Sequence, residues 1–189
     1  MDPVDPPTIV RWTQRLEDAE ALDPAVDAVR PAVRTAFATG TRGAVLRGDW
    51  LGHALHPIMT DLVIGSWTSA TVLDLFGGDD SATAARRLVG TGLLAFGPTA
   101  WTGWAEWSEA GPQEQRVGLV HAVTNGAAVG VYTASWLARR RGRHGAGAAL
   151  ALAGAALMGG AAYLGGHLAA ARKVGTHHVA YDEVTSATT

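Results

Sequence analysis

Histidines and one acid recur near the ends of the apolar segments in this 189-residue chain. His53, His56 and Asp61 stand at the start of the first apolar segment, and His121 and His167 stand in two later ones. Ionisable side chains are costly inside an apolar segment, so those found there usually face a bundle interior or a cavity and serve a site. Since the chain has no cysteine, the histidine imidazoles are the main ligands that it can offer to a transition metal. The residues therefore predict a site that the apolar segments must assemble.

Four segments have the length and composition of membrane helices. They cover residues 57–76, 88–105, 117–138 and 145–171 and contain very few charges. A helix of about 20 residues is ~30 Å long, which matches the hydrocarbon thickness of a bilayer. Pro57 suits the first turn of the first span. The sequence thus predicts an all-α fold, an integral membrane antiparallel four-helix bundle with both termini on the same side.

Small residues dominate the last two segments. The chain has 24 glycines, and Gly126 and Gly130 form a GxxxG pattern in the third segment. In lipid such residues matter because they let helices approach closely and make van der Waals contact. The pattern predicts either tight packing within the bundle or a homo-oligomer, and both alternatives stay open.

The two ends of the chain differ from its middle. Residues 1–50 are polar enough for water and predict two amphipathic helices, at 8–21 and 24–37. In the second, Val26, Val29 and Val33 recur at helical spacing among charged residues. Such a helix lies on a membrane surface, on a partner or on the domain itself, and the sequence does not choose among these. Residues 176–189 are expected to form a flexible tail.

Alternation of the spans brings the histidines to one membrane face. His121 lies five residues inside Arg116 and His167 five residues inside Arg172, so each lies about 7 Å below the interface. Asp61 lies at a similar depth below Pro57. Asn125 follows His121 by one helical turn, and Tyr163 precedes His167 by one turn, so each shares its histidine's helix face.

Three kinds of site agree with this pattern. First, His121 and His167 could bind the iron of haem b from opposite sides, with His53 or His56 as the substitute ligand and Asn125 and Tyr163 nearby. A haem held in this way would shuttle single electrons. Second, a divalent metal could be held by a set drawn from His56, His121, His167 and Asp61. Third, the histidines could hydrogen-bond internally to acids, which makes a structural or partner-scaffolding bundle.

Charge limits the remaining possibilities. The net charge of −2 gives no reason to expect a nucleic-acid partner. Basic residues flank the spans evenly on both sides, so the positive-inside rule leaves the orientation undecided. Asp74 and the arginines of residues 139–143 are expected to be solvated at the far side. No nucleophile-and-base arrangement or phosphate loop is present, so the sequence gives no basis for hydrolytic or transferase chemistry, and an enzymatic role stays open.

Four motifs carry a resemblance to a known family. LGHALHPIMTDLVIGSW, TGWAEW, RVGLVHAVTN and LGGHL resemble a bacterial four-helix membrane family classed as domain of unknown function 2231, over about residues 40–175. Ala54 stands where that family usually has proline, and Glu106 where it commonly has aspartate. The resemblance implies a multi-pass protein of the bacterial cell membrane.

The resemblance also bears on partners. Members of the family often continue into a Rieske iron–sulfur domain, whereas no cysteine follows Gly175 in this chain. The resemblance therefore implies a separate Rieske-type or other redox protein as partner, besides the lipid bilayer.

Overall fold

The computed structural model describes residues 5–176, and these residues form helices and turns without a strand. This confirms the predicted all-α fold. The seven α-helices are α1 (Thr8–Glu17), α2 (Asp23–Val33), α3 (Gly40–Arg47), α4 (Leu55–Phe76), α5 (Ala82–Trp107), α6 (Pro112–Arg140) and α7 (His144–Gly166). Short 3₁₀ turns lie at Glu20–Leu22, Asp49–Leu51 and Asp79–Ser81, and π turns at Arg34–Ala38 and His167–Ala171.

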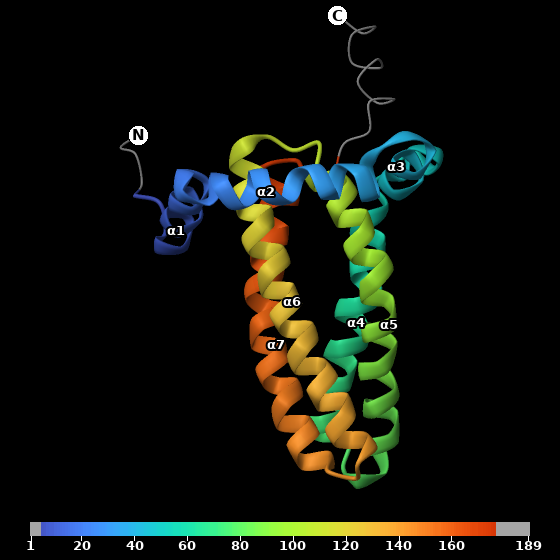
Figure 1. Cartoon of the computed structure of the whole chain (residues 1–189). Helices are drawn as coiled ribbons and strands as arrows, with labels where there is room; N and C mark the ends of the chain where they lie inside the picture. The colour runs from blue at the N-terminus through green and yellow to red at the C-terminus, as the bar shows by residue number, and fades with distance from the viewer. Residues whose placement is uncertain (1–4, 177–189) are drawn as a thin grey trace, which may run out of the picture.

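The four long helices form two hairpins that lie side by side. Figure 1 shows α4 against α5 and α6 against α7, with neighbouring helices running in opposite directions. The turns between them carry the signals that end helices. Gly78, two residues after the end of α4, has φ +65°, a left-handed conformation that favours glycine, and Pro112 occupies the first turn of α6. Each hairpin is thus a continuous structural unit of two helices.

Membrane-spanning potential differs among these helices. Within the described residues, one helical stretch, His144–Ala171, is long and apolar enough to cross a bilayer by length and composition. The described helix α4 carries Asp61 and Asp74, and α6 begins and ends among charged residues. That all four long helices cross the membrane stays a prediction.

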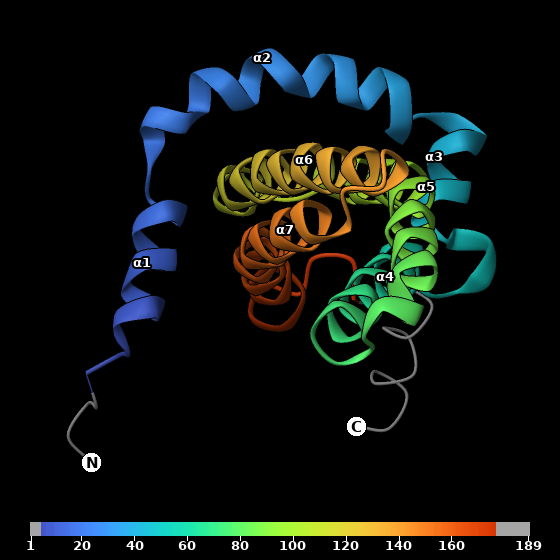
Figure 2. The same ribbon diagram turned by 90° about the horizontal axis from the view of Figure 1, so that it is seen from below.

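The N-terminal helices form a collar, here defined as residues 8–47, around one end of the long helices. Seen along the bundle in Figure 2, α1 and α2 pass outside α6 and α7, and α3 lies next to α5. The apolar face of α2 is filled by the bundle, since Val26 and Val33 are buried against Trp107. The sequence left open whether this helix lies on a membrane surface, on a partner or on the domain itself. In the structure it packs on the domain itself.

Both described ends of the chain lie at the collar end of the long helices (Figure 1). Residues 177–189, which make up nearly all of the expected tail, lie outside the described residues. The helix α3 was not predicted. It is short, and its glycines Gly40 and Gly43 weaken any helical signal, while Gly43 is needed because a side chain there would meet the carbonyl of Ala38.

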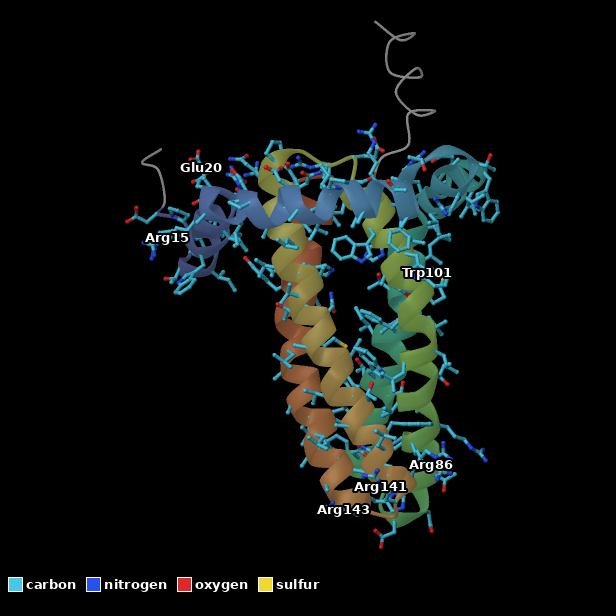
Figure 3. All side chains as sticks on the ribbon, in the orientation of Figure 1. Arg15, Glu20, Arg86, Trp101, Arg141 and Arg143 are labelled. Carbon is cyan, nitrogen blue, oxygen red and sulfur yellow. The ribbon has the colours of Figure 1, made fainter. Side chains whose placement is uncertain are left out.

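A buried ion pair lies at the opposite end, where solvated charges were expected. The side chains of Asp74 and Arg139 are 6% and 1% exposed. Arg139 donates from Nη1 to Asp74 Oδ1 at 2.8 Å, a second hydrogen bond joins Nη2 to Oδ2, and Nε donates to Ser135. The expectation was wrong for these two residues, because the absence of a side chain at Gly147 lets Arg139 fold inward. Arg141 and Arg143 are exposed, and Figure 3 places them at the loop.

The GxxxG glycines do not mediate packing between the described helices. A Cβ added at Gly126 or Gly130 would meet no other described atom within 4 Å. Gly92, Gly103, Gly154 and Gly165 make the close contacts instead, each against an aromatic or imidazole ring of the neighbouring helix. The spacing of glycines alone therefore did not identify the interhelical contacts.

Candidate functional site

A cavity of about 350 Å³ lies between the two hairpins. This volume is within the range of small-molecule and cofactor sites. All four long helices line it. Two imidazole rings face it, His56 from α4 and His121 from α6, together with the side chains of Asn125, Phe96 and Met158.

The ring of His56 is held by α5. Its Nδ1 lies 2.9 Å from the carbonyl oxygen of Thr99 and 3.1 Å from the hydroxyl oxygen of Thr102. A carbonyl only accepts, so Nδ1 carries the hydrogen and donates it, which leaves the lone pair of the neutral ring on Nε2. The ring rests on Gly103, where an added Cβ would lie 2.8 Å from Cε1. The orientation of His56 is thus fixed by backbone atoms.

The ring of His121 is held by α7 in the same way. Its Nδ1 donates to the carbonyl oxygen of Ala161 at 2.8 Å, and a Cβ at Gly165 would lie 2.9 Å from Cε1. The Nε2 atom accepts a hydrogen bond from Asn125 Nδ2 at 3.0 Å. Both histidines therefore have the same tautomer, with the basic nitrogen Nε2 on the side away from the backbone anchor.

The two histidines occupy equivalent positions in two copies of one helix-hairpin pattern. His121 comes 65 positions after His56, while the residues that hold them, Thr99 with Gly103 and Ala161 with Gly165, are 62 positions apart (99 to 161 and 103 to 165). In each hairpin the acceptor carbonyl lies four residues before the glycine on which the ring rests. One histidine and its anchors thus repeat the other.

The same spacing relates two further layers of contacts between the hairpins. Trp67 and Tyr132, 65 positions apart, stack with ring centroids 3.9 Å apart, and they rest on Gly92 and Gly154, 62 positions apart. Asp74 and Arg139, again 65 positions apart, form the buried ion pair. Equivalent residues thus contact one another at two levels, and His56 and His121 face one cavity at a third. This is the arrangement of an approximate two-fold axis. The cavity lies at one end of this axis.

This internal repeat was missed from the sequence, although a short signal of it is present. IGSWTSA at residues 64–70 and VGVYTAS at residues 129–135 share a glycine, then an aromatic residue two positions later, then a threonine. The second helices of the hairpins share glycines at 92, 97 and 103 with 154, 159 and 165. Aligning these segments pairs His56 with His121 without any structure.

His167 faces away from the cavity. Its Nε2 lies 2.5 Å from Oε1 of Glu17 on α1, and Arg172 donates to both carboxylate oxygens of the same residue. The side chain of Glu17 is only 3% exposed, and the hydrogen bonds from Arg172, with those from His167, hold its pKa below the ordinary range. His167 follows Gly165 by two residues, about 200° around the helix, and Gly165 is the residue that faces His121.

Of the remaining expected site residues, one lines the cavity and three are exposed on the outside of the described structure. Asn125 lines the cavity beside His121. Tyr163 is 38% exposed, Asp61 is exposed on the outside of α4, and His53 is exposed with its Nδ1 3.5 Å from the carbonyl of Leu51. No group of three or more histidine, aspartate or glutamate side chains within residues 5–176 is arranged to hold a metal ion. Of the expected constellation, the structure brings together His56, His121 and Asn125.

Glu106 joins the site from α5. It lines the cavity, and its Oε1 atom is buried without a hydrogen-bond partner among the described atoms. Buried polar atoms are normally paired, so an unpaired one that faces a cavity marks a place where a ligand or water can bind. The sequence analysis expected Glu106 on the same side as the histidines, and the structure shows that Glu106, His56 and His121 line one cavity.

Comparison with known proteins gives one relationship. No curated protein and no solved structure matches the chain. A family model described as "Predicted membrane protein (DUF2231)" matches residues 52–178, a region that includes all four long helices and both cavity histidines. This match covers more than half of the chain, and the protein belongs to the DUF2231 family of predicted membrane proteins.

Proposed function

We propose that this membrane protein holds haem b between its two hairpins, where His56 and His121 would bind the iron and the haem would supply single-electron transfer. The observation that supports the proposal is the matched pair of imidazoles, one from each hairpin, each with Nδ1 tied to a backbone carbonyl. Iron-bound histidines in proteins typically donate their other ring nitrogen to such an acceptor, which fixes the ring and raises its basicity. His56 thus takes the place that His167 had in the sequence-based hypothesis.

The residues around the cavity fit this cofactor. Phe96 and Met158, at equivalent positions of α5 and α7, supply apolar contacts, and Trp67 closes the cavity toward the middle of the bundle. Asn125 would give up its hydrogen bond to His121 Nε2 when that nitrogen binds a ligand. A bound haem would supply one-electron redox chemistry, and the protein's part is to orient the two rings and exclude water.

All four long helices cross the membrane in this proposal. Family membership and the apolar stretch His144–Ala171 support it. So do the large apolar side chains that the long helices expose, which lipid tails would cover: Leu62, Val72, Leu75, Phe76, Leu94, Val123 and Leu152. The protein would then be a multi-pass protein of the bacterial cell membrane with both termini on one side. The surface of α6 at Gly130 is open, so a homo-oligomer that pairs through α6 is compatible with the proposal.

Electron transfer needs a donor or acceptor. A Rieske-type or other redox protein is the partner that we propose, on the basis of the family resemblance alone. It would dock at the collar end, since the cavity lies nearer to that end than the Asp74–Arg139 pair does.

The haem content of the purified protein tests the proposal. Protein produced with ample haem should carry it in proportion to the chain, and the variant His56→Ala should lose it while His53→Ala, altered three residues away on the exposed turn, should keep it. Elemental analysis of the same samples tests the alternative that the two histidines bind a divalent metal ion instead of haem. A colourless protein that retains zinc, manganese or another divalent ion would contradict haem and favour the metal.

A structural bundle is the second candidate, and one observation favours it. Each of the described histidines His56, His121 and His167 already has a hydrogen bond within the chain. In that case His121→Ala should lower the unfolding temperature and change no bound species. Loss of a haem or metal on this substitution would count against a purely structural role.

A further inference from the structure

The helix α1 has three distinct faces. Thr13 and Glu17 are buried against the bundle, and Arg11, Gln14, Arg15 and Asp18 form an exposed polar face. The third face is apolar, with Ile9 and Trp12 51% and 66% exposed and Leu16 next to them at helical spacing. A large exposed tryptophan beside an exposed isoleucine is typical of a contact surface. No described residue covers this one.

The position of α1 relates this face to the membrane. In Figure 2 the helix runs across the direction of the long helices, and in Figure 1 it lies beside them, below the level of α2. It therefore does not cap the end of the bundle. Trp101, a half-exposed residue of α5, lies at the same end in Figure 3, and tryptophans of membrane proteins concentrate at the headgroup level.

Buried polar contacts fix α1 at this height. Glu17, the last residue of α1, binds His167 and Arg172 at the end of α7. Arg116 at the start of α6 donates to the carbonyl of Glu17 at 2.8 Å and pairs with Asp23. Because both arginines stand just outside the apolar stretches of their helices, α1 is held at the level where those stretches end.

We propose that α1 lies in the headgroup region of the bilayer, with Ile9, Trp12 and Leu16 inserted among the upper acyl chains. An interfacial helix has an apolar face toward the acyl chains and charged residues, especially arginine, on its polar face, which is the pattern of Arg11 and Arg15 here. The occupant is lipid rather than a protein, since the same level of the bundle would be surrounded by lipid. In α2, by contrast, the apolar face is filled by Trp107. This inference requires membrane insertion but not haem.

Single cysteines test it cleanly, because the natural chain has none. Trp12→Cys and Gln14→Cys would each be spin-labelled in the full-length protein reconstituted in liposomes. Both residues are exposed, and they lie about 200° apart around one helix. The label at position 12 should collide often with oxygen, which dissolves in the acyl region, and rarely with a nickel chelate, which stays in water. The label at position 14 should collide often with the chelate.

Two other results would overturn the inference. Equal access of the nickel chelate to both labels would place α1 in water. A label at position 12 that is immobilised and shielded from both oxygen and the chelate would indicate a protein contact, from a partner or a second copy. Ile9→Cys repeats the test on the same face, and size-exclusion chromatography confirms that each variant remains folded.

Discussion

Two glycines determine where the candidate ligand atoms lie. Gly103 and Gly165 face the rings of His56 and His121, and each leaves the space in which its imidazole sits. The backbone carbonyls of Thr99 and Ala161 then determine which nitrogen carries the hydrogen. The chemistry proposed for the site thus depends on four residues that act through a backbone carbonyl or through the absence of a side chain.

Substituting these glycines should displace the rings. Gly103→Ala or Gly165→Ala puts a Cβ less than 3 Å from an imidazole carbon, and such overpacking costs about 1–3 kcal/mol of stability. Both variants should unfold at lower temperature and bind less haem. Gly97→Ala and Gly159→Ala are the matched controls, because they are also equivalent positions and an added Cβ there meets nothing. Equal behaviour of all four variants would show that the rings are not held by these contacts.

Glu17 should make the free energy of unfolding depend on pH in the acidic range. Its pKa is lowered in the folded state, so its stabilisation is fully present above the unfolded pKa of about 4.3 and is lost as the pH falls through the folded value. Glu17→Gln should cost about 2 kcal/mol at pH 7, the scale of hydrogen bonds to a charged group. Thermal unfolding measured from pH 7 to pH 3 should show that the difference in stability between the natural chain and Glu17→Gln becomes smaller as the pH falls. Glu20→Gln, at an exposed neighbour, is the control, and a gap that stays constant with pH would contradict the assignment.

At the scale of elements, the two hairpins are joined by contacts between equivalent residues. The Trp67–Tyr132 stack lies in the middle of the bundle and the Asp74–Arg139 pair lies at the loop end. Close glycines allow both contacts, since Gly92 and Gly154 accommodate the rings and Gly147 accommodates Arg139. These two layers hold the hairpins together on the side of the cavity that lies away from the collar.

The buried ion pair gives a prediction at this scale. Arg139→Leu leaves the carboxylate of Asp74 buried and unpaired, which costs about 3–5 kcal/mol. The double variant Asp74→Leu with Arg139→Leu removes both charges and should be more stable than Arg139→Leu alone. Thermal unfolding in detergent measures these two variants and the single variant Asp74→Leu, with Arg141→Leu as the exposed control. A double variant as unstable as the sum of the two single ones would mean that the charges do not interact.

At the scale of the whole molecule, the sequence predicted the long helices well because their apolar length and their glycine and proline breaks are local properties. The predicted spans all fall within α4 to α7 and the turn that follows α7. The structure does not bring His167 to the cavity that His121 lines, because position along a helix does not give the direction around it. His121 and His167 were expected at one depth, yet Gly165 faces the cavity and His167, two residues later, faces α1.

The internal repeat contains the missing information. It pairs His121 with His56, and it pairs His167 with Ala105, a fully buried residue with no ligand atom. The burial of Asp74 and Arg139 follows from the same pairing, since opposite charges at equivalent positions meet across the axis. The placement of α1 and α2 could not be predicted this way, because it depends on polar contacts such as Glu17 with Arg172 that join residues 155 positions apart.

The most direct test of the central claim is a dithionite-reduced minus air-oxidised visible spectrum of detergent-purified, haem-replete protein. It should be recorded for the natural chain and for His56→Ala, His121→Ala and His167→Ala. A two-histidine haem between the hairpins predicts a sharp alpha band that is lost in the His56 and His121 variants and kept in the His167 variant. A flat spectrum of the natural chain, or a band that survives His56→Ala and disappears in His167→Ala, would contradict it.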